Sequence, residues 1–208
     1  MLSGTSLKSV GTRMGIAIAA LGLGIALASP SSAEPRVLEA DMNHTTVSWS
    51  ISHGGFSTVR GIFRNITKAE ITFDPENVAN SSVVAAVETA SLDSNHAFRD
   101  NFTRSDKFLD VIQFNEISFV STKIEKTGDN TGTMTGDLTM HGVTKPVTFN
   151  VTYNKGGDHL SGKFKIDGFT ATAKIKRSDF DVKAFIPWVA DEVDITIDIE
   201  GIHSRQPG

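Results

Sequence analysis

The chain has no cysteine among its 208 residues. This absence excludes thiol catalysis, thiolate metal sites and thiol–disulfide exchange. It also excludes a lipid-modified cysteine at a cleavage site. Without disulfide cross-links, the stability of the protein must come from buried apolar surface.

The chain also lacks an excess of positive charge. Its 20 Lys and Arg residues face 24 Asp and Glu residues, which gives a formal net charge of −4. We therefore expect neither nucleic acid nor an anionic membrane surface as its partner. After about residue 36 there is no Pro/Ser-rich linker, no low-complexity tract and no internal repeat. One continuous domain over residues 34–208 is the expected organisation.

The N-terminus has the three-part pattern of a secretory signal peptide. Lys8 and Arg13 precede the apolar run 14–28, and a site of small residues that ends at Ala33 follows. The run of about 15 residues is shorter than the roughly 20 that a transmembrane helix needs. We expect residues 1–33 to be removed, leaving a periplasmic or secreted protein without a stable membrane anchor.

The dominant hydrophobic period is two. Between residues 193 and 200 every odd position is apolar and β-branched and every even position is polar, which predicts an antiparallel sheet with one dry face. Eight antiparallel strands can close into a barrel whose interior holds one small ligand, although a two-sheet sandwich has the same alternation. The eight predicted strands are 45–53, 59–74, 82–92, 114–126, 131–141, 146–155, 159–176 and 191–203.

The period changes to a helical one between residues 94 and 105. Ser94 is a suitable N-cap, and Phe98 and Phe102 lie four residues apart on one helical face. We expect one short helix that carries these two rings to the mouth of the barrel as a gate. The alternative is that the rings anchor a crossover to the core.

The most distinctive segment is 136–147, which predicts a strand, a tight turn and a second strand. His141 and Gly142 supply the turn, because glycine accepts the positive φ that a tight hairpin demands. Pro146 has no N–H, so it belongs at the start of the second strand or on an unpaired edge.

Four ordered blocks of residues form a pattern over essentially the whole mature chain. In this pattern the sequence resembles the YceI-like family of exported lipid-binding proteins. The resemblance implies an eight-stranded antiparallel, lipocalin-like barrel around a long apolar tunnel, with polyisoprenoids or other extended lipids as ligands and no catalysis. The blocks are Asp41, His44, Val47, Trp49 and His53 with 57–63 and 73–74; 91–93, 99–100, 104–105, Phe108 and Asp110 with 117–119 and 121–122; 136–147; and 175–180 with 191–193.

The chain departs from the family pattern at two places. Phe102-Thr103 stands where the family commonly has His-Leu, and Asp181 stands where it commonly has Gly. The first change makes the helix more apolar on the ligand side or reshapes it, and the second puts a carboxylate in a turn near the end of the barrel.

An extended lipid needs apolar walls, because burial of hydrocarbon contributes about 0.8 kcal/mol per CH₂. Thirteen Phe against one Tyr suit such walls, although the same rings can equally fill a solid core. The predicted ligand-binding residues lie on the alternating strand faces or on the helix: Trp49, Ile51, His53, Phe63, Phe73, Phe98, Phe102, Phe119, Met140, Phe149, Val151, Phe164, Phe169, Ile195 and Ile197.

Few polar residues are candidates for a lipid head group. His53 has the same parity as Trp49, so its imidazole is a candidate hydrogen-bond partner. Arg99 and Arg104 on the predicted helix are candidates to pair with a diphosphate or carboxylate, with local ion pairs as the alternative. Trp188 is a candidate for the mouth of the barrel, with an ordinary surface contact as the alternative.

The six histidines contain no His-x-His pair, so we expect no metal site and no cofactor beyond the bound lipid. We favour a non-catalytic carrier or reservoir for an isoprenoid quinone, a polyprenyl phosphate or a fatty acid derivative. The alternatives are a lipid-modifying hydrolase that uses His53 or His141 with a carboxylate, and a structural module with a solid core. The oligomeric state is undecided from the sequence, because a closed barrel can still form a homodimer through its loops.

Overall fold

The computed structural model describes residues 1, 3–4 and 35–203. The predicted signal peptide lies outside these residues, apart from residues 1, 3 and 4. The chain divides into the units Met1–Ser31 and Ser32–Gly208, and every strand that the structure describes belongs to the second unit. No helix in the described part of the chain has the length and hydrophobicity needed to span a membrane.

Antiparallel strands account for most of the described chain, with one α-helix and three short 3₁₀ segments among the described residues. The helix α1 is Ala97–Arg104, and the 3₁₀ segments are η1 (Val78–Asn80), η2 (Thr89–Ser91) and η3 (Arg177–Phe180). The strands are β1 (Arg36–Ala40), β2 (Thr46–His53), β3 (Ser57–Phe63), β4 (Ile66–Phe73), β5 (Ser82–Glu88), β6 (Leu92–Asp93), β7 (Glu116–Lys126), β8 (Thr131–Met140), β9 (Val143–Asp158), β10 (Lys165–Lys176) and β11 (Val189–His203).

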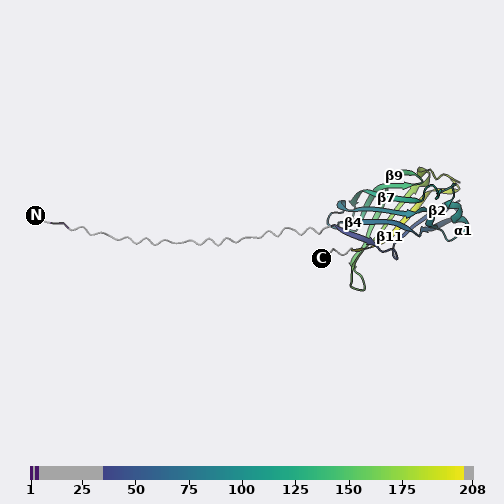
Figure 1. The fold of residues 1–208 in the computed structure, drawn as a ribbon. Helices are drawn as coiled ribbons and strands as arrows, with labels where there is room; N and C mark the ends of the chain where they lie inside the picture. The colour runs from purple at the N-terminus through teal and green to yellow at the C-terminus, as the bar shows by residue number, and fades with distance from the viewer. Residues whose placement is uncertain (2, 5–34, 204–208) are drawn as a thin grey trace. The chain divides into compact units, whose positions relative to one another are not determined.

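The sheet closes on itself, as Figure 1 shows. Its order is β1-β4-β5-β7-β8-β9-β10-β11-β2-β3-β6, and β1 also pairs with β11. Both β1 and β2 pair with β11, so they form one strand that is interrupted at residues 41–45. The pairs β3/β4 and β5/β6 are interrupted in the same way. Counted like this, eight antiparallel strands close the barrel. The predicted barrel is confirmed, and the sandwich is not formed.

Several strand boundaries differ from prediction. The predicted strands 59–74 and 82–92 are each interrupted, and β9 extends beyond the predicted 146–155 at both ends. β1 was not predicted, because five residues are too few to show a clear alternation. The predicted strand 159–176 begins only at Lys165, since residues 159–164 form a turn. In that turn the N–H of Gly162 donates to the carbonyl of His159 at 2.7 Å, and Gly162 has a φ of +66°.

Helix α1 begins later than predicted. Its N-cap is His96, whose Nδ1 accepts a hydrogen bond from the N–H of Arg99 at 3.4 Å. Ser94 is not the cap. It donates instead to the carboxylate of the buried Asp100, through its hydroxyl and through its N–H at 2.9 Å. This contact ties the helix to the chain that precedes it.

The hairpin β8–β9 has the predicted turn. Met140 pairs with Val143, and His141 and Gly142 between them have φ of 51° and 73°. Two consecutive positive φ values define a type I′ turn, which matches the twist of a hairpin. Pro146 pairs with Asp137 but precedes the point where β9 begins to pair with β10. Its missing N–H therefore interrupts no second ladder.

Candidate functional site

An apolar cavity of about 780 Å³ lies inside the barrel. This volume is within the range of about 300–1,000 Å³ that is usual for small-molecule sites. The predicted residues that line it are Trp49, Ile51, His53, Phe63, Phe73, Phe102, Phe119, Met140, Phe149, Val151, Phe169, Ile195 and Ile197. Their contact with a ligand stays a prediction.

Two predicted wall residues do not line the cavity. Phe98 is 78% exposed and lies one helical turn before Phe102, whose ring packs against Phe108 and Phe185. Phe164 lies in the β9–β10 turn, and its ring stacks on the imidazole of His159 at a centroid distance of 4.3 Å. Of the two rings expected to form a gate, only Phe102 reaches the cavity.

The cavity extends along the axis of the barrel. His53, Phe102 and Trp188 line it at the end that carries α1, whereas Arg36 and Tyr153 line it at the opposite end. The predicted tunnel is therefore present. Several wall residues were missed although they lie in predicted strands, and parity alone would have identified them: Ile71, Val83, Ala85, Val87, Met134, Leu138 and Ile175.

The wall at the opposite end contains a buried polar network centred on Asp167, which is 1% exposed. Its carboxylate accepts hydrogen bonds from Arg36 Nη1 at 3.0 Å and from the Tyr153 hydroxyl at 2.8 Å, and His203 Nε2 lies 2.7 Å from it. Burial and the neighbouring carboxylate raise the pKa of Tyr153. The positive charge of Arg36 is therefore already paired within the protein.

The two arginines of the helix have different roles. Arg99 lines the cavity, and its Nε and Nη2 donate to the hydroxyl and the carbonyl of Ser94, each at 2.6 Å. Both partners are neutral. Arg104 donates to the carbonyls of Ala90 and Leu92 and does not line the cavity. Of the two head-group candidates, the structure brings only Arg99 to the cavity.

Arg177 fixes the loop at the mouth of the cavity, a role that the sequence did not predict. The side chain is 4% exposed and lies over the ring of Phe108, 5.6 Å from its centroid. Burial lowers the pKa of Arg177. Its guanidinium donates four hydrogen bonds of 2.8–2.9 Å, and every acceptor is a backbone carbonyl of the loop or of the start of β11: Val182, Ala184, Val189 and Ala190.

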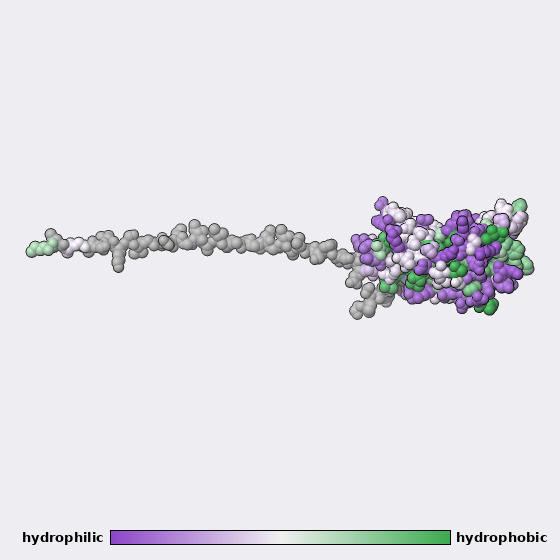
Figure 2. Space-filling model, turned by 90° about the horizontal axis from the view of Figure 1, so that it is seen from above, coloured by the Kyte–Doolittle hydropathy of each residue, from purple (hydrophilic) through white to green (hydrophobic). Residues whose placement is uncertain are grey.

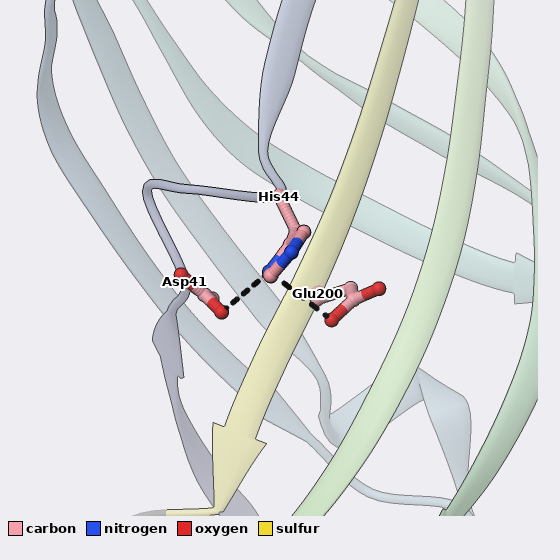
Figure 3. A group of neighbouring side chains, drawn as sticks. All are labelled: Asp41, His44 and Glu200. Atoms are coloured by element: carbon pink, nitrogen blue, oxygen red, sulfur yellow. Dashed lines mark hydrogen bonds and ion pairs between the residues drawn. The ribbon is translucent and has the colours of Figure 1, made fainter. Parts of the chain in front are cut away.

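A second polar group joins β1, β2 and β11 where the first strand is interrupted. Figure 3 shows His44 between Asp41 and Glu200, with Nδ1 at 2.8 Å from Asp41 Oδ2 and 3.8 Å from Glu200 Oε2. Hydrogen bonding to Asp41, then the charges of both carboxylates, raises the pKa of His44. The donor atoms lie within 4.8 Å of one another, close enough to hold a metal ion. Their own contacts account for the arrangement, so we treat the group as a structural clamp.

The histidines named for a hydrolase are poorly placed for one. His141 lies in the β8–β9 turn against the ring of Phe114, at a centroid distance of 4.4 Å, and does not line the cavity. His53 lines the mouth, where Trp188 meets its ring edge-on at 6.1 Å. Within the described residues no hydrogen bond joins either imidazole to a carboxylate.

Comparison with known proteins gives a consistent picture. Residues 38–201 match the family model of the YceI-like domain. A UPF0312 protein of Pseudomonas putida strain GB-1 is 41% identical over 191 residues, which cover 90% of this chain and 97% of that protein. The crystal structure of BcnA from Burkholderia cenocepacia is 26% identical, with a TM-score of 0.71 over 78% of this chain and 99% of BcnA.

One solved structure with lower sequence identity is named after the class of ligand that it binds. It is a polyisoprenoid binding domain from Saccharophagus degradans implicated in plant cell wall breakdown. The TM-score is 0.56 over 81% of this chain and 98% of that domain, at 13% identity. At this identity the likeness shows a shared fold.

Proposed function

Because the chain belongs to the YceI-like family, we propose that its barrel binds one extended apolar lipid, such as a polyisoprenoid, without catalysis. The observation that carries the proposal is the apolar cavity of about 780 Å³ that extends along the barrel. The polyisoprenoid binding domain of the same fold supports this ligand class.

The walls suit a long hydrocarbon chain. The rings of Phe119 and Phe149 meet edge to face in the wall, and Met134 and Met140 add unbranched side chains that follow an irregular ligand. Each CH₂ removed from water contributes about 0.8 kcal/mol, so a chain of many carbons binds tightly without a polar contact. An isoprenoid quinone, a polyprenyl phosphate and a fatty acid derivative all meet this requirement.

An anionic head group is best accommodated at the α1 end. Arg99 faces the cavity there with neutral hydrogen-bond partners, whereas Arg36 at the opposite end is already paired with Asp167. The guanidinium of Arg99, whose partner Ser94 also donates to the buried Asp100, is therefore the candidate for a phosphate or carboxylate. The imidazole of His53 is a second polar contact at the same mouth. The apolar tail would extend toward Tyr153.

We place this function in the periplasm, on the basis of the signal-peptide pattern in residues 1–33. Transport, storage and sensing of the lipid all use the same binding step.

Native mass spectrometry and organic extraction of the protein from its own cell envelope test the proposal. We expect one lipid per chain. The variant Ala171→Phe adds a ring to the buried cavity wall and should lose the lipid, whereas Thr172→Phe adds the same ring at the neighbouring exposed position and should keep it. Absence of lipid from the wild type, both as purified and after titration with isoprenoid chains, would refute the proposal.

A further inference from the structure

Large apolar side chains are exposed around the α1 end of the barrel. They come from three segments: the β2–β3 turn, the helix α1 and the loop that precedes β11. Figure 2 shows hydrophobic surface at its right-hand end, which is the α1 end in Figure 1. We call this set the aromatic rim, and its members with their exposed fractions are Phe56 (80%), Phe98 (78%), Phe102 (40%), Phe185 (55%), Ile186 (37%) and Trp188 (57%).

The rim is continuous across chain segments. The ring of Phe56 packs against Trp188 at a centroid distance of 5.8 Å, and Phe102 packs against Phe185 at 5.9 Å. Phe185 also stacks on Phe108 at 6.0 Å, and Phe108 lines the cavity. The loop that precedes β11 contributes a ring to each of these two groups, Trp188 to the first and Phe185 to the second, with the exposed Ile186 between them in sequence.

The rim is also continuous with the cavity. Phe102, Phe185 and Trp188 are exposed on one side and line the cavity on the other. A lipid that leaves the cavity at this end passes over these rings before it meets water. The rim therefore favours the same kind of molecule as the cavity, which is an apolar lipid.

We propose that the aromatic rim docks the mouth of the barrel onto the surface of a lipid bilayer, where lipid enters and leaves the cavity. The inference rests on the proposed function, because the bilayer is the source of an insoluble lipid. Tryptophan and other aromatic side chains are typical of the membrane–water interface, and soluble proteins rarely expose large contiguous apolar patches without a partner.

Two features of the mouth fit docking by apolar burial. Arg177 holds the loop that carries Phe185 and Trp188 through four carbonyl groups, so the rim is formed in advance and little order is lost on docking. The ammonium of Lys183 in the same loop is paired with Asp181 at 2.6 Å. The rim residues are apolar, so docking should depend more on apolar burial than on anionic lipids or salt.

Co-sedimentation of the mature protein with phosphatidylcholine vesicles tests the inference. Phe56→Ser and Phe98→Ser remove exposed rings that do not line the cavity. The double variant should bind vesicles at least about tenfold more weakly, since burial of each ring contributes to docking. Leu160→Ser is the matched control, because Leu160 is 96% exposed in the β9–β10 turn at the opposite end and should leave binding unchanged.

Binding of a soluble short-chain isoprenoid, measured without vesicles, separates the two claims. Wild type and double variant should bind it equally, which supports docking as a separate role of the rim. Absence of isoprenoid binding in the wild type would refute the proposed function. Equal vesicle binding by wild type and double variant, loss of vesicle binding in high salt, or dimerisation of the protein through the rim would each overturn the docking inference.

Discussion

The ring of Phe119 in β7 meets the ring of Phe149 in β9 edge to face, with centroids 5.2 Å apart. Between them, β8 carries Gly136, and the ring of Phe119 lies where a Cβ on this glycine would stand. The two rings can therefore meet only because residue 136 is a glycine and has no side chain. This contact therefore affects both the stability of the barrel and the shape of the cavity.

Removal of one of these rings should destabilise the barrel. Phe149 is 3% exposed, so we expect Phe149→Ala to lower the free energy of unfolding by about 3 kcal/mol. Urea denaturation measures the change. Val120→Ala, on the exposed face of β7, should change stability by less than about 0.5 kcal/mol. Similar effects of both substitutions would contradict the assigned faces.

The network around Asp167 should be more sensitive to loss of the carboxylate than to loss of one donor. Asp167→Ala leaves Arg36, Tyr153 and His203 without their shared acceptor and should cost about 2–3 kcal/mol. Tyr153→Phe removes one hydrogen bond and should cost about 1 kcal/mol. Chemical denaturation of both variants gives the comparison. An equal cost would show that Asp167 is not the centre of the network.

The clamp at His44 should make stability depend on pH. The folded-state pKa of His44 is raised above 6.5, so the protonated imidazole is stabilised by Asp41 and Glu200 in the folded protein. This contribution is fully present below the unfolded pKa and is lost as the pH rises through the folded pKa.

The His44 variant tests this dependence. The stability gap between wild type and His44→Gln should be larger at about pH 5.5 than at about pH 8.5. NMR titration should place the pKa of His44 above that of a free imidazole, and Asp41→Asn should lower it. A gap that widens as the pH rises would contradict the sign of the effect.

The β8–β9 turn should not accept a side chain at Gly142. Its φ is +73°, and a Cβ there would lie 2.6 Å from Cε1 of Phe114. Gly142→Ala should therefore lower stability by about 1–2 kcal/mol. Gly157→Ala is the control, since a Cβ at Gly157 meets nothing within 4 Å. Thermal unfolding compares the two variants, and a neutral Gly142→Ala would count against the turn geometry.

The strands were predictable from sequence because alternation is a local signal. The odd positions of β11 show it clearly, and Ile195 and Ile197 face the cavity as expected. Turn chemistry was also local, as His141 and Gly142 show. Asp181 has a φ of 64°, a left-handed conformation that glycine adopts without strain, which agrees with the glycine that the resemblance leads one to expect there.

Contacts between distant segments could not be predicted in the same way. Glu200 meets His44 only because the barrel closes between β11 and the first interrupted strand. Arg177 donates to backbone carbonyls of a loop, and the path of that loop cannot be predicted from a pattern of side chains. Phe98 was misplaced because helical spacing puts it on the same face as Phe102 but does not show which turn of the helix meets Phe108 and Phe185.

The most direct test of the central claim is a titration of the delipidated protein with polyprenols of increasing chain length. We predict saturable binding of one lipid per chain, with an affinity that rises with each added isoprene unit until the cavity of about 780 Å³ is filled. Ala171→Phe should bind only the shorter chains. Absence of saturable binding at every chain length, with the protein folded, would contradict the account.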